Sequence, residues 1–168
     1  MLKVFTNKSR GFTLIELLVV IAVIGLLASI VLVSVGPARA KARDARRQSD
    51  IRQINLAMEM CYDDALCGPG EAKYPVHAGT IPITNAWTKI DNDDGNPTFL
   101  TMPSDPTNSG NYIYKWGATN EQYYCFYTQL EAPTAVTWYC ASNKGVAQKV
   151  YAGPPTAANC CGMLNINL

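Results

Sequence analysis

Residues 9–35 read SRGFTLIELLVVIAVIGLLASIVLVSV, and this stretch decides how the rest of the chain is organised. From Phe12 to Val35 the sequence is apolar almost without interruption, and Glu16 is its only charged residue. At about 1.5 Å rise per residue, a helix over this segment is roughly 36 Å long, enough to cross a bilayer core of about 30 Å with some tilt. Its Leu, Ile and Val residues lie all round the helix, which is typical of a segment solvated by lipid or by other helices.

Glu16 is the exception that needs a physical reason. A carboxylate inside an apolar span costs about 2.5–3.5 kcal/mol at mid-membrane and less near an end, so such residues tend to have a partner. The plain alternative is that Glu16, only four residues into the span, reaches back to the lipid headgroups.

The residues before the span favour the partnered interpretation. Residues 8–16 read KSRGFTLIE: a short basic leader, Gly, Phe, three residues and then Glu, followed by the long apolar run. This pattern resembles the processing site of type IV prepilins and the related pseudopilins. The resemblance implies cleavage after Gly11 by a membrane prepilin peptidase and N-methylation of the new amino terminus at Phe12. It also implies that Glu16 pairs with the terminal amine of a neighbouring subunit during assembly.

The sequence also contains a possible alternative cleavage site, of the kind that signal peptidase recognises. Ala38-Arg39-Ala40 has the form of an ordinary signal-peptidase site, which would discard everything before Lys41. A signal sequence, however, has an apolar region of about 7–15 residues, and the present run is longer and contains a charge. We therefore expect the helix to be retained.

Composition bounds the remaining possibilities. The chain has 168 residues and a formal net charge of +1. This small net charge does not indicate binding to nucleic acid or to an acidic substrate. Once the leader and the span are set aside, the remainder suits one small domain. His77 is the single histidine, which excludes a multi-histidine metal site and disfavours a histidine-based catalytic triad. We predict neither an enzyme nor a cofactor.

Six cysteines lie beyond the span: Cys61, Cys67, Cys125, Cys140, Cys160 and Cys161. An even number on one side of a membrane anchor indicates an oxidising compartment and disulfides. The chain has no C-x-x-C pair, so a zinc site is the weaker interpretation. Six cysteines allow 15 connectivities, and the sequence does not choose among them.

The helix is expected to continue beyond the membrane. Residues 38–65 are rich in Ala, Arg, Gln, Met and Leu and free of Gly and Pro. One apolar stripe, on which a globular head would pack, comprises Ile51, Ile54, Met58 and Cys61. Many type IV pilins carry a proline well inside the span, whereas the first proline here is Pro37. This departure puts mid-span melting of the helix in doubt and favours pseudopilin-like relatives slightly.

A basic run follows the span, comprising Arg39, Lys41, Arg43, Arg46, Arg47 and Arg52. The positive-inside rule alone would place this side in the cytoplasm. We give more weight to the cysteines and the processing motif, which place it outside. The arginines form either a solvated helix face or contacts with acids of adjacent subunits, namely Asp44, Asp50, Glu59, Asp63 or Asp64.

Strand signals appear late in the chain. Residues 112–116 alternate, 123–129 and 136–141 are predicted to form a hairpin around 131–134, and 149–151 is a possible last strand. In that register Cys125 faces Cys140, and we expect the two to bond. A ring joining Cys160 to Cys161 is strained, so at least one of these should bond elsewhere, with Cys61 or Cys67 as candidates.

Two segments of the head carry a second, less specific resemblance to G-type pseudopilins and related pilins. These are Tyr74-Pro75, and residues 102–108 followed by Tyr112-Ile113-Tyr114. The oxygen-rich loop from Asp91 to Gly95 lacks the distant Glu of an EF-hand, and we favour a solvated acidic turn over a calcium site. The aromatic residues between 112 and 139 suit a sheet core better than a stacking platform for sugars or single-stranded DNA.

We therefore predict an α+β fold of the pilin type, in which a long N-terminal helix packs its outer half on a small antiparallel sheet. Its parts are a leader (1–11), a membrane and filament-core helix (12–35), an amphipathic continuation (36–66) and a disulfide-stapled head (67–168). The predicted function is that of a structural subunit of a type IV pilus or pilus-like filament. The alternatives are a type II secretion pseudopilin, or a membrane-anchored adhesin or DNA-uptake minor pilin whose head binds a ligand.

The resemblance also implies partners and a location. The partners are further copies of the chain, the prepilin peptidase and N-methyltransferase, an inner-membrane assembly platform with its ATPase, minor pilins, and the bilayer before assembly. The chain is expected in the inner membrane with its head outside the cytoplasm, and then in a periplasmic or extracellular filament.

Overall fold

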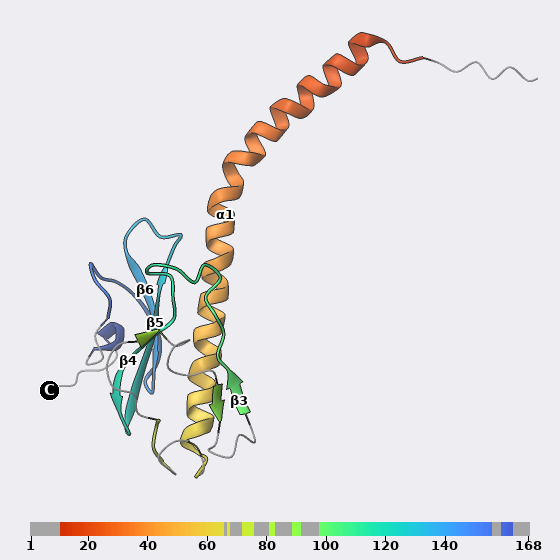
Figure 1. Ribbon diagram of the computed structural model, residues 1–168. Coiled ribbons are helices and arrows are strands. Elements are labelled where there is room, and N and C mark those ends of the chain that lie inside the picture. Colours follow the sequence, from red (N-terminus) through yellow and green to blue (C-terminus); the bar gives the residue numbers. More distant parts are fainter. Residues whose placement is uncertain are drawn as a thin grey trace, which may run out of the picture. The chain divides into compact units, whose positions relative to one another are not determined.

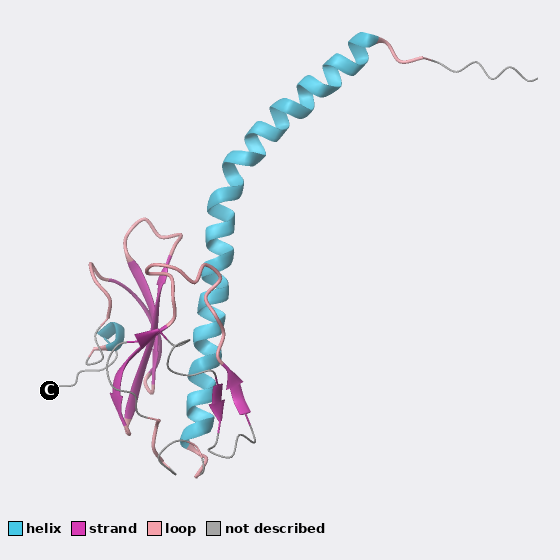
Figure 2. Ribbon diagram, viewed as in Figure 1, coloured by secondary structure: helices cyan, strands magenta, loops and turns pink. Residues whose placement is uncertain are grey.

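The computed structural model describes residues 11–65, 67, 72–75, 81–82, 89–91, 98–155 and 159–162. The chain divides into two compact units, residues 1–39 and residues 40–168. One helix and two antiparallel sheets account for most of the described chain (Figures 1 and 2), as the sequence predicted for an α+β fold.

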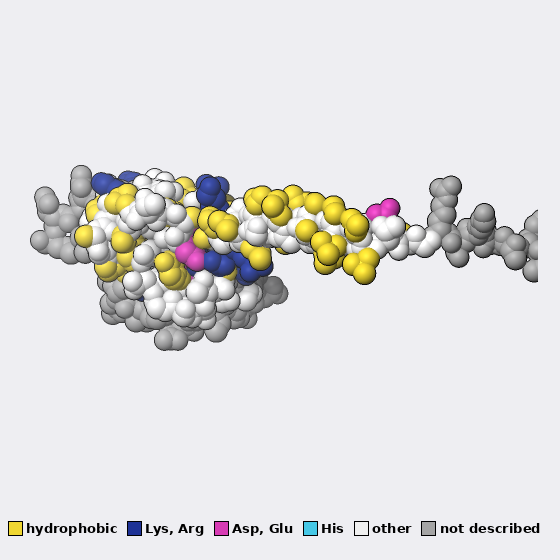
Figure 3. Space-filling model, turned by 90° about the horizontal axis from the view of Figure 1, so that it is seen from above, with side chains coloured by type: hydrophobic (Ala, Val, Ile, Leu, Met, Phe, Trp, Pro, Cys, Tyr) yellow, Lys and Arg dark blue, Asp and Glu magenta, His cyan; other side chains and the backbone are white. Residues whose placement is uncertain are grey.

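Helix α1 runs from Leu14 to Tyr62 and contributes to both units. It includes Gly36 and Pro37, although a proline has no N–H to donate to the carbonyl four residues earlier. In the first unit the large apolar side chains between Phe12 and Val33 are 50–86% exposed. Figure 3 shows these hydrophobic side chains along the helix, and the segment is long and apolar enough to cross a membrane.

In the second unit, the same helix has a buried face. The predicted stripe of Ile51, Ile54, Met58 and Cys61 is fully buried, each residue at 0% exposure. It packs with aromatic residues of the sheet, among them Trp116, Tyr124 and Phe126. The apolar spacing read from the sequence therefore identified the helix face that the head covers.

The main sheet has five strands in the order β1-β4-β5-β6-β7, all antiparallel. Their bounds are β1, Ile81–Pro82; β4, Lys115–Asn120; β5, Tyr123–Leu130; β6, Thr137–Ser142; and β7, Gly145–Val150. The expected strand over 112–116 instead begins at Lys115, and the last strand is longer than expected. A second, two-stranded sheet joins β2 (Lys89–Asp91) to β3 (Thr98–Thr101), on another side of α1 in Figure 1.

The central hairpin has a different register from the one expected. Strand β5 pairs with β6 so that Cys140 lies opposite Tyr127, and Leu130 lies opposite Thr137. The prediction that Cys125 faces Cys140 is therefore wrong by two residues, because the hairpin is centred between Pro133 and Thr134, one residue beyond the expected centre. A slip of two residues keeps every side chain on its own face, so the hydrophobic pattern did not reveal it.

Three disulfides connect the cysteines of the second unit, in the pairs Cys61–Cys67, Cys125–Cys160 and Cys140–Cys161. The expected bond between Cys125 and Cys140 is not formed. Both members of the vicinal pair bond elsewhere, as the strain argument required, but to the sheet strands and not to Cys61 or Cys67. The short 3₁₀ segment Cys160–Gly162 is thereby held on the sheet face that lies away from α1.

Candidate processing and assembly site

The start of α1 is closed by a reciprocal set of hydrogen bonds. Because the helix begins at Leu14, Thr13 is its N-cap and Glu16 is the third helical residue. The backbone N–H and the hydroxyl of Thr13 each donate to Oε2 of Glu16 at 2.8 Å, and the N–H of Glu16 donates to Oγ1 of Thr13 at 3.2 Å. This is a capping box, whose T-x-x-E signature stands in the sequence but was not considered in the prediction.

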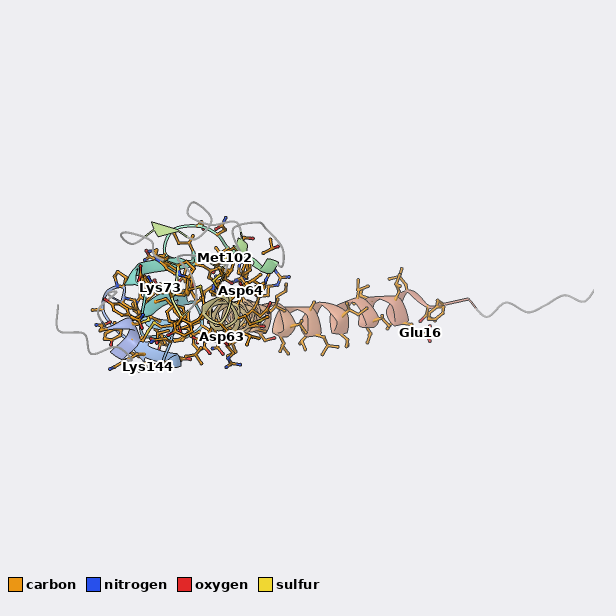
Figure 4. The ribbon with its side chains drawn as sticks, turned by 90° about the horizontal axis from the view of Figure 1, so that it is seen from below. Glu16, Asp63, Asp64, Lys73, Met102 and Lys144 are labelled. Atoms are coloured by element: carbon orange, nitrogen blue, oxygen red, sulfur yellow. A yellow bond between two sulfur atoms is a disulfide. The ribbon has the colours of Figure 1, made fainter. Side chains whose placement is uncertain are left out.

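The capping box determines where the carboxylate of Glu16 lies. Both bonds from Thr13 go to Oε2, and no described residue bonds to Oε1. Figure 4 shows Glu16 at the N-terminal end of α1. Gly11 and Phe12, the two residues of the predicted cleavage point, come directly before the cap and are exposed. The arrangement combines an accessible peptide bond with an anion that has one oxygen free.

The basic run beyond the span is divided between buried and exposed residues. Arg47 is fully buried at 0% exposure, whereas Arg39 and Lys41 are exposed. Nε of Arg46 lies 3.6 Å from Oδ2 of Asp50. Nε of Arg52 donates to the hydroxyl of Tyr139 at 2.9 Å. The interpretation as a solvated face is thus wrong for Arg47.

The guanidinium of Arg47 connects three segments of the second unit. It forms a bidentate pair with Asp105, with N–O distances of 2.7 and 2.9 Å, and donates to Asp44 at 2.8 Å and to Glu131 at 3.3 Å. Burial alone would lower the pKa of Arg47, but the hydrogen bonds that it donates to Asp105 and Asp44 outweigh burial and raise the pKa. We refer to Arg47, Asp44, Asp105 and Glu131 as the arginine cluster.

Glu131 and Asp44 extend the arginine cluster to the β5–β6 loop. Arg43 forms a second ion pair with Glu131, and its hydrogen bond holds the pKa of the Glu131 carboxyl below its usual range. Asp44 accepts from the backbone N–H of Glu131 at 2.8 Å and of Ala132 at 2.7 Å. Arg43, Arg47 and Asp44 therefore have ionic partners within their own chain and do not need an acid or a base of a neighbouring subunit.

Tyrosine hydroxyls bind two further acids of the helix, the buried Asp50 and the half-buried Glu59. Tyr114 donates to Asp50 at 2.6 Å, and Tyr124 and Tyr74 donate to Glu59 at 2.6 and 2.9 Å. Burial, followed by these hydrogen bonds to carboxylates, raises the pKa of all three tyrosines above the ordinary value. Tyr74, Asp105 and Tyr114 belong to the segments singled out in the sequence, and the structure gives all three a packing role against α1.

The remaining sequence hypotheses have different outcomes. Within the described residues, no group of three or more His, Cys, Asp or Glu is placed to hold a metal ion. Most of the loop from Asp91 to Gly95, and His77, lie outside the described residues. The aromatic residues Trp116, Tyr124, Phe126, Tyr127 and Trp138 are buried, which confirms their interpretation as core.

Comparisons with known proteins find one family model and several relatives that match part of the chain. A family model described as the prokaryotic N-terminal methylation motif matches residues 6–32. The type II secretion system core protein G of Escherichia coli (strain K12) is 44% identical over 55 residues, which cover 33% of this chain and 38% of the relative. Two probable minor fimbrial proteins of Dichelobacter nodosus are 40% and 39% identical over 58 residues, covering 34% of this chain and 36% of each relative.

The similarities to these relatives cover about a third of this chain. The chain spans well under half the length of the curated relatives it matches. No solved structure gives a significant match. The motif matched by the family model contains Gly11, Phe12, Thr13 and Glu16, which are the residues of the capping box and the exposed peptide bond.

The arginine cluster yields a stability prediction. Replacing Arg47 by Met removes the cation and leaves the buried carboxylates of Asp44 and Asp105 without it. We expect the free energy of unfolding to fall by about 3–5 kcal/mol, because one partner of a buried ion pair is lost. Urea unfolding of the full chain in detergent micelles, followed by tryptophan fluorescence, measures this. Lys41→Met, at an exposed position of the same helix, is the control and should change stability by about 0.5 kcal/mol or less.

The tyrosine–carboxylate pairs predict a loss of stability in alkali. The folded state keeps the phenolic protons of Tyr74, Tyr114 and Tyr124 above about pH 10, where the unfolded chain releases them, so stability must fall as pH rises past that value. Each tyrosine contributes up to about 1.4 kcal/mol per pH unit. Urea midpoints between about pH 8 and about pH 11 give the slope. Tyr114→Phe should flatten the slope by about a third, and an unchanged slope would contradict the assignment.

Proposed function

We propose that the chain is a structural subunit of a pilus or pilus-like filament, of the type IV prepilin and pseudopilin kind. The N-terminal methylation motif and the similarity to a type II secretion core protein and to probable minor fimbrial proteins support this proposal. The observation that carries the proposal is the contrast within α1. Its first part exposes apolar side chains on every side, while its second part buries one stripe beneath the head. A helix surface of the first kind needs lipid before assembly and the helices of other subunits afterwards.

Processing comes first in the proposed sequence of events. A membrane peptidase cleaves between Gly11 and Phe12, and the new amino terminus at Phe12 is methylated. The exposure of both residues supports access to this bond. Cleavage creates a cation one residue before the N-cap Thr13, beside the anion of Glu16.

Assembly then uses the carboxylate of Glu16. Within one subunit, its Oε2 is occupied by Thr13. Its Oε1 is available to the terminal amine of a neighbouring subunit, so that capping and pairing use different oxygens. Inside a helix bundle, pairing the two charges removes the cost of leaving either one alone in an apolar surrounding.

The proposed location follows from the disulfides and the span. Three disulfides indicate that the head folds in an oxidising compartment, outside the cytoplasm. The span anchors the chain in the inner membrane until it is transferred to the filament. The proposed partners are further copies of the chain, minor pilins, the peptidase and N-methyltransferase, and an assembly platform with its ATPase.

The proposed processing predicts the N-terminal residue of the mature protein. We expect the protein from its native host to begin at Phe12 and to carry an N-methyl group, because Gly11 ends a basic leader directly before the apolar run. Intact-mass measurement decides this. A chain that begins at Met1 or at Lys41 contradicts the proposal.

Substitutions of Glu16 separate the effect of its negative charge from its role in the capping box of α1. Glu16→Ala should insert and lose its leader, yet yield few or no filaments. Loss of one partner of a buried pair costs about 3–5 kcal/mol. This loss corresponds to a decrease of roughly two to three and a half orders of magnitude in the equilibrium constant for subunit addition. Glu16→Asp should retain partial assembly. The readouts are leader removal by mass and filament yield by shearing and electron microscopy.

Glu16→Gln is the matched control, because its amide oxygen still accepts from Thr13 while the negative charge is gone. If the charge is needed, Gln and Ala fail alike. If only the cap is needed, Gln assembles normally and Ala does not. Normal filament yield from a correctly processed Glu16→Gln variant would remove the proposed ion pair.

A further inference from the structure

Four cysteines of the head lie in one buried cluster. Cys125 of β5, Cys140 of β6 and the adjacent pair Cys160 and Cys161 pack together with Tyr127 and Trp138, and each cysteine is at most 4% exposed. The native bonds skip the nearest partner along the chain. Cys125 bonds to Cys160, 35 residues away, and Cys140 bonds to Cys161, 21 residues away.

Chain connectivity favours a different first bond. Cys125 and Cys140 are consecutive cysteines, 15 residues apart, and both are synthesised before the tail. Loop-closure entropy favours this separation over the 35-residue separation of the native pair by roughly 3.5-fold. The reduced chain therefore has a competing route to a Cys125–Cys140 disulfide.

That disulfide does not fit the native sheet. In the observed register Tyr127 lies opposite Cys140, so Cys125 and Cys140 are diagonal neighbours. Diagonal positions in an antiparallel pair are about 7–8 Å apart, beyond the usual reach of a disulfide. The bond requires the β5–β6 hairpin to slip by two residues, which moves the centre of its turn by one residue.

The slipped hairpin can trap the chain because the alternating side-chain pattern is compatible with both registers. A slip of two residues leaves every apolar residue on its own face of the sheet. What distinguishes the native register lies outside the hairpin: Asp44 of α1 binds the backbone N–H groups of Glu131 and Ala132 in the loop. A hairpin closed by a premature disulfide loses this contact.

The tail adds a second ambiguity. Cys160 and Cys161 have φ values of 36° and 59°, in the left-handed region that residues other than glycine seldom adopt. Because the two are adjacent in sequence, loop closure barely distinguishes them as partners of a given strand cysteine. In the native assignment both residues have this left-handed conformation and lie in the buried cysteine cluster.

We propose that the native pairing is reached by thiol–disulfide exchange from a Cys125–Cys140 intermediate, and that the head is a substrate of a thiol–disulfide isomerase. The isomerase thiolate attacks Sγ of Cys125, forming a mixed disulfide and releasing Cys140 as a thiolate. The thiolate of Cys160 then attacks Sγ of Cys125 and regenerates the isomerase thiolate, with no net transfer of electrons. The thiols of Cys140 and Cys161 finally lose two electrons and two protons to a disulfide oxidant, which becomes a dithiol.

Refolding of the reduced full chain in detergent micelles tests this without any reference to filaments. One arm contains oxidised glutathione alone, and the other adds a catalytic amount of a thiol–disulfide isomerase in its reduced, thiol form. After the remaining thiols are blocked, digestion after Glu131 and Lys144 separates the strand cysteines from each other and from the tail. Native pairing joins three peptides, whereas the intermediate joins only the two strand peptides.

We expect the isomerase to raise the three-peptide fraction by up to about 4.5-fold, because a roughly 3.5-fold bias toward the strand-to-strand bond leaves about one chain in 4.5 natively paired. Tandem mass spectrometry of the three-peptide species must also show the Cys125–Cys160 and Cys140–Cys161 bonds. Equal native fractions in both arms, or no strand-to-strand peptide with oxidant alone, would overturn the proposal.

Two double variants sharpen the test. Replacing both Cys140 and Cys161 by Ala leaves Cys125 with Cys160, removes the trap, and should make refolding independent of the isomerase. Replacing both Cys61 and Cys67 by Ser removes the separate disulfide at the end of α1 and should leave the dependence unchanged. The opposite result would contradict the proposal. In that case the variant without Cys140 and Cys161 would still need the isomerase, the variant without Cys61 and Cys67 would not, and the isomerase would be needed for the Cys61–Cys67 bond.

Discussion

The head depends on one buried positive charge. A guanidinium with no exposure is acceptable only where carboxylates surround it, and Arg47 takes them from three places: the helix, the 102–112 segment and the β5–β6 loop. Satisfying this group therefore holds three segments of the chain in place at once. A cluster of this kind contributes more to defining one arrangement than to net stability, since an apolar replacement of all its members could be equally stable.

The two parts of α1 have opposite physical requirements. In the second unit the helix meets its own head, through an apolar stripe flanked by carboxylates that accept from tyrosines. In the first unit the helix presents apolar side chains that the described chain does not cover. The second part is satisfied within one subunit, whereas the first part needs lipid or other subunits. This difference connects the fold to the proposed filament.

The head is small, and it adds covalent and polar connections to its apolar core. Three disulfides tie the end of the helix and the C-terminal tail to the rest of the unit. Such connections are common where a domain buries too little surface to rely on packing alone. They also introduce a dependence on the correct register of one hairpin, because the tail cysteines find their partners only when β5 and β6 are aligned.

The sequence by itself determined the features that depend on neighbours along the chain. The uninterrupted apolar run, the isolated Glu16 and the four buried positions of the helix stripe could all be read from composition and helical spacing. The capping box of Thr13 and Glu16 was also readable, although it was missed. Only the tertiary structure decided which of six basic residues is buried, the hairpin register and the cysteine pairing. A helix spacing does not identify the acid that a distant loop brings to Arg47, and an alternating strand pattern is unchanged by a slip of two residues.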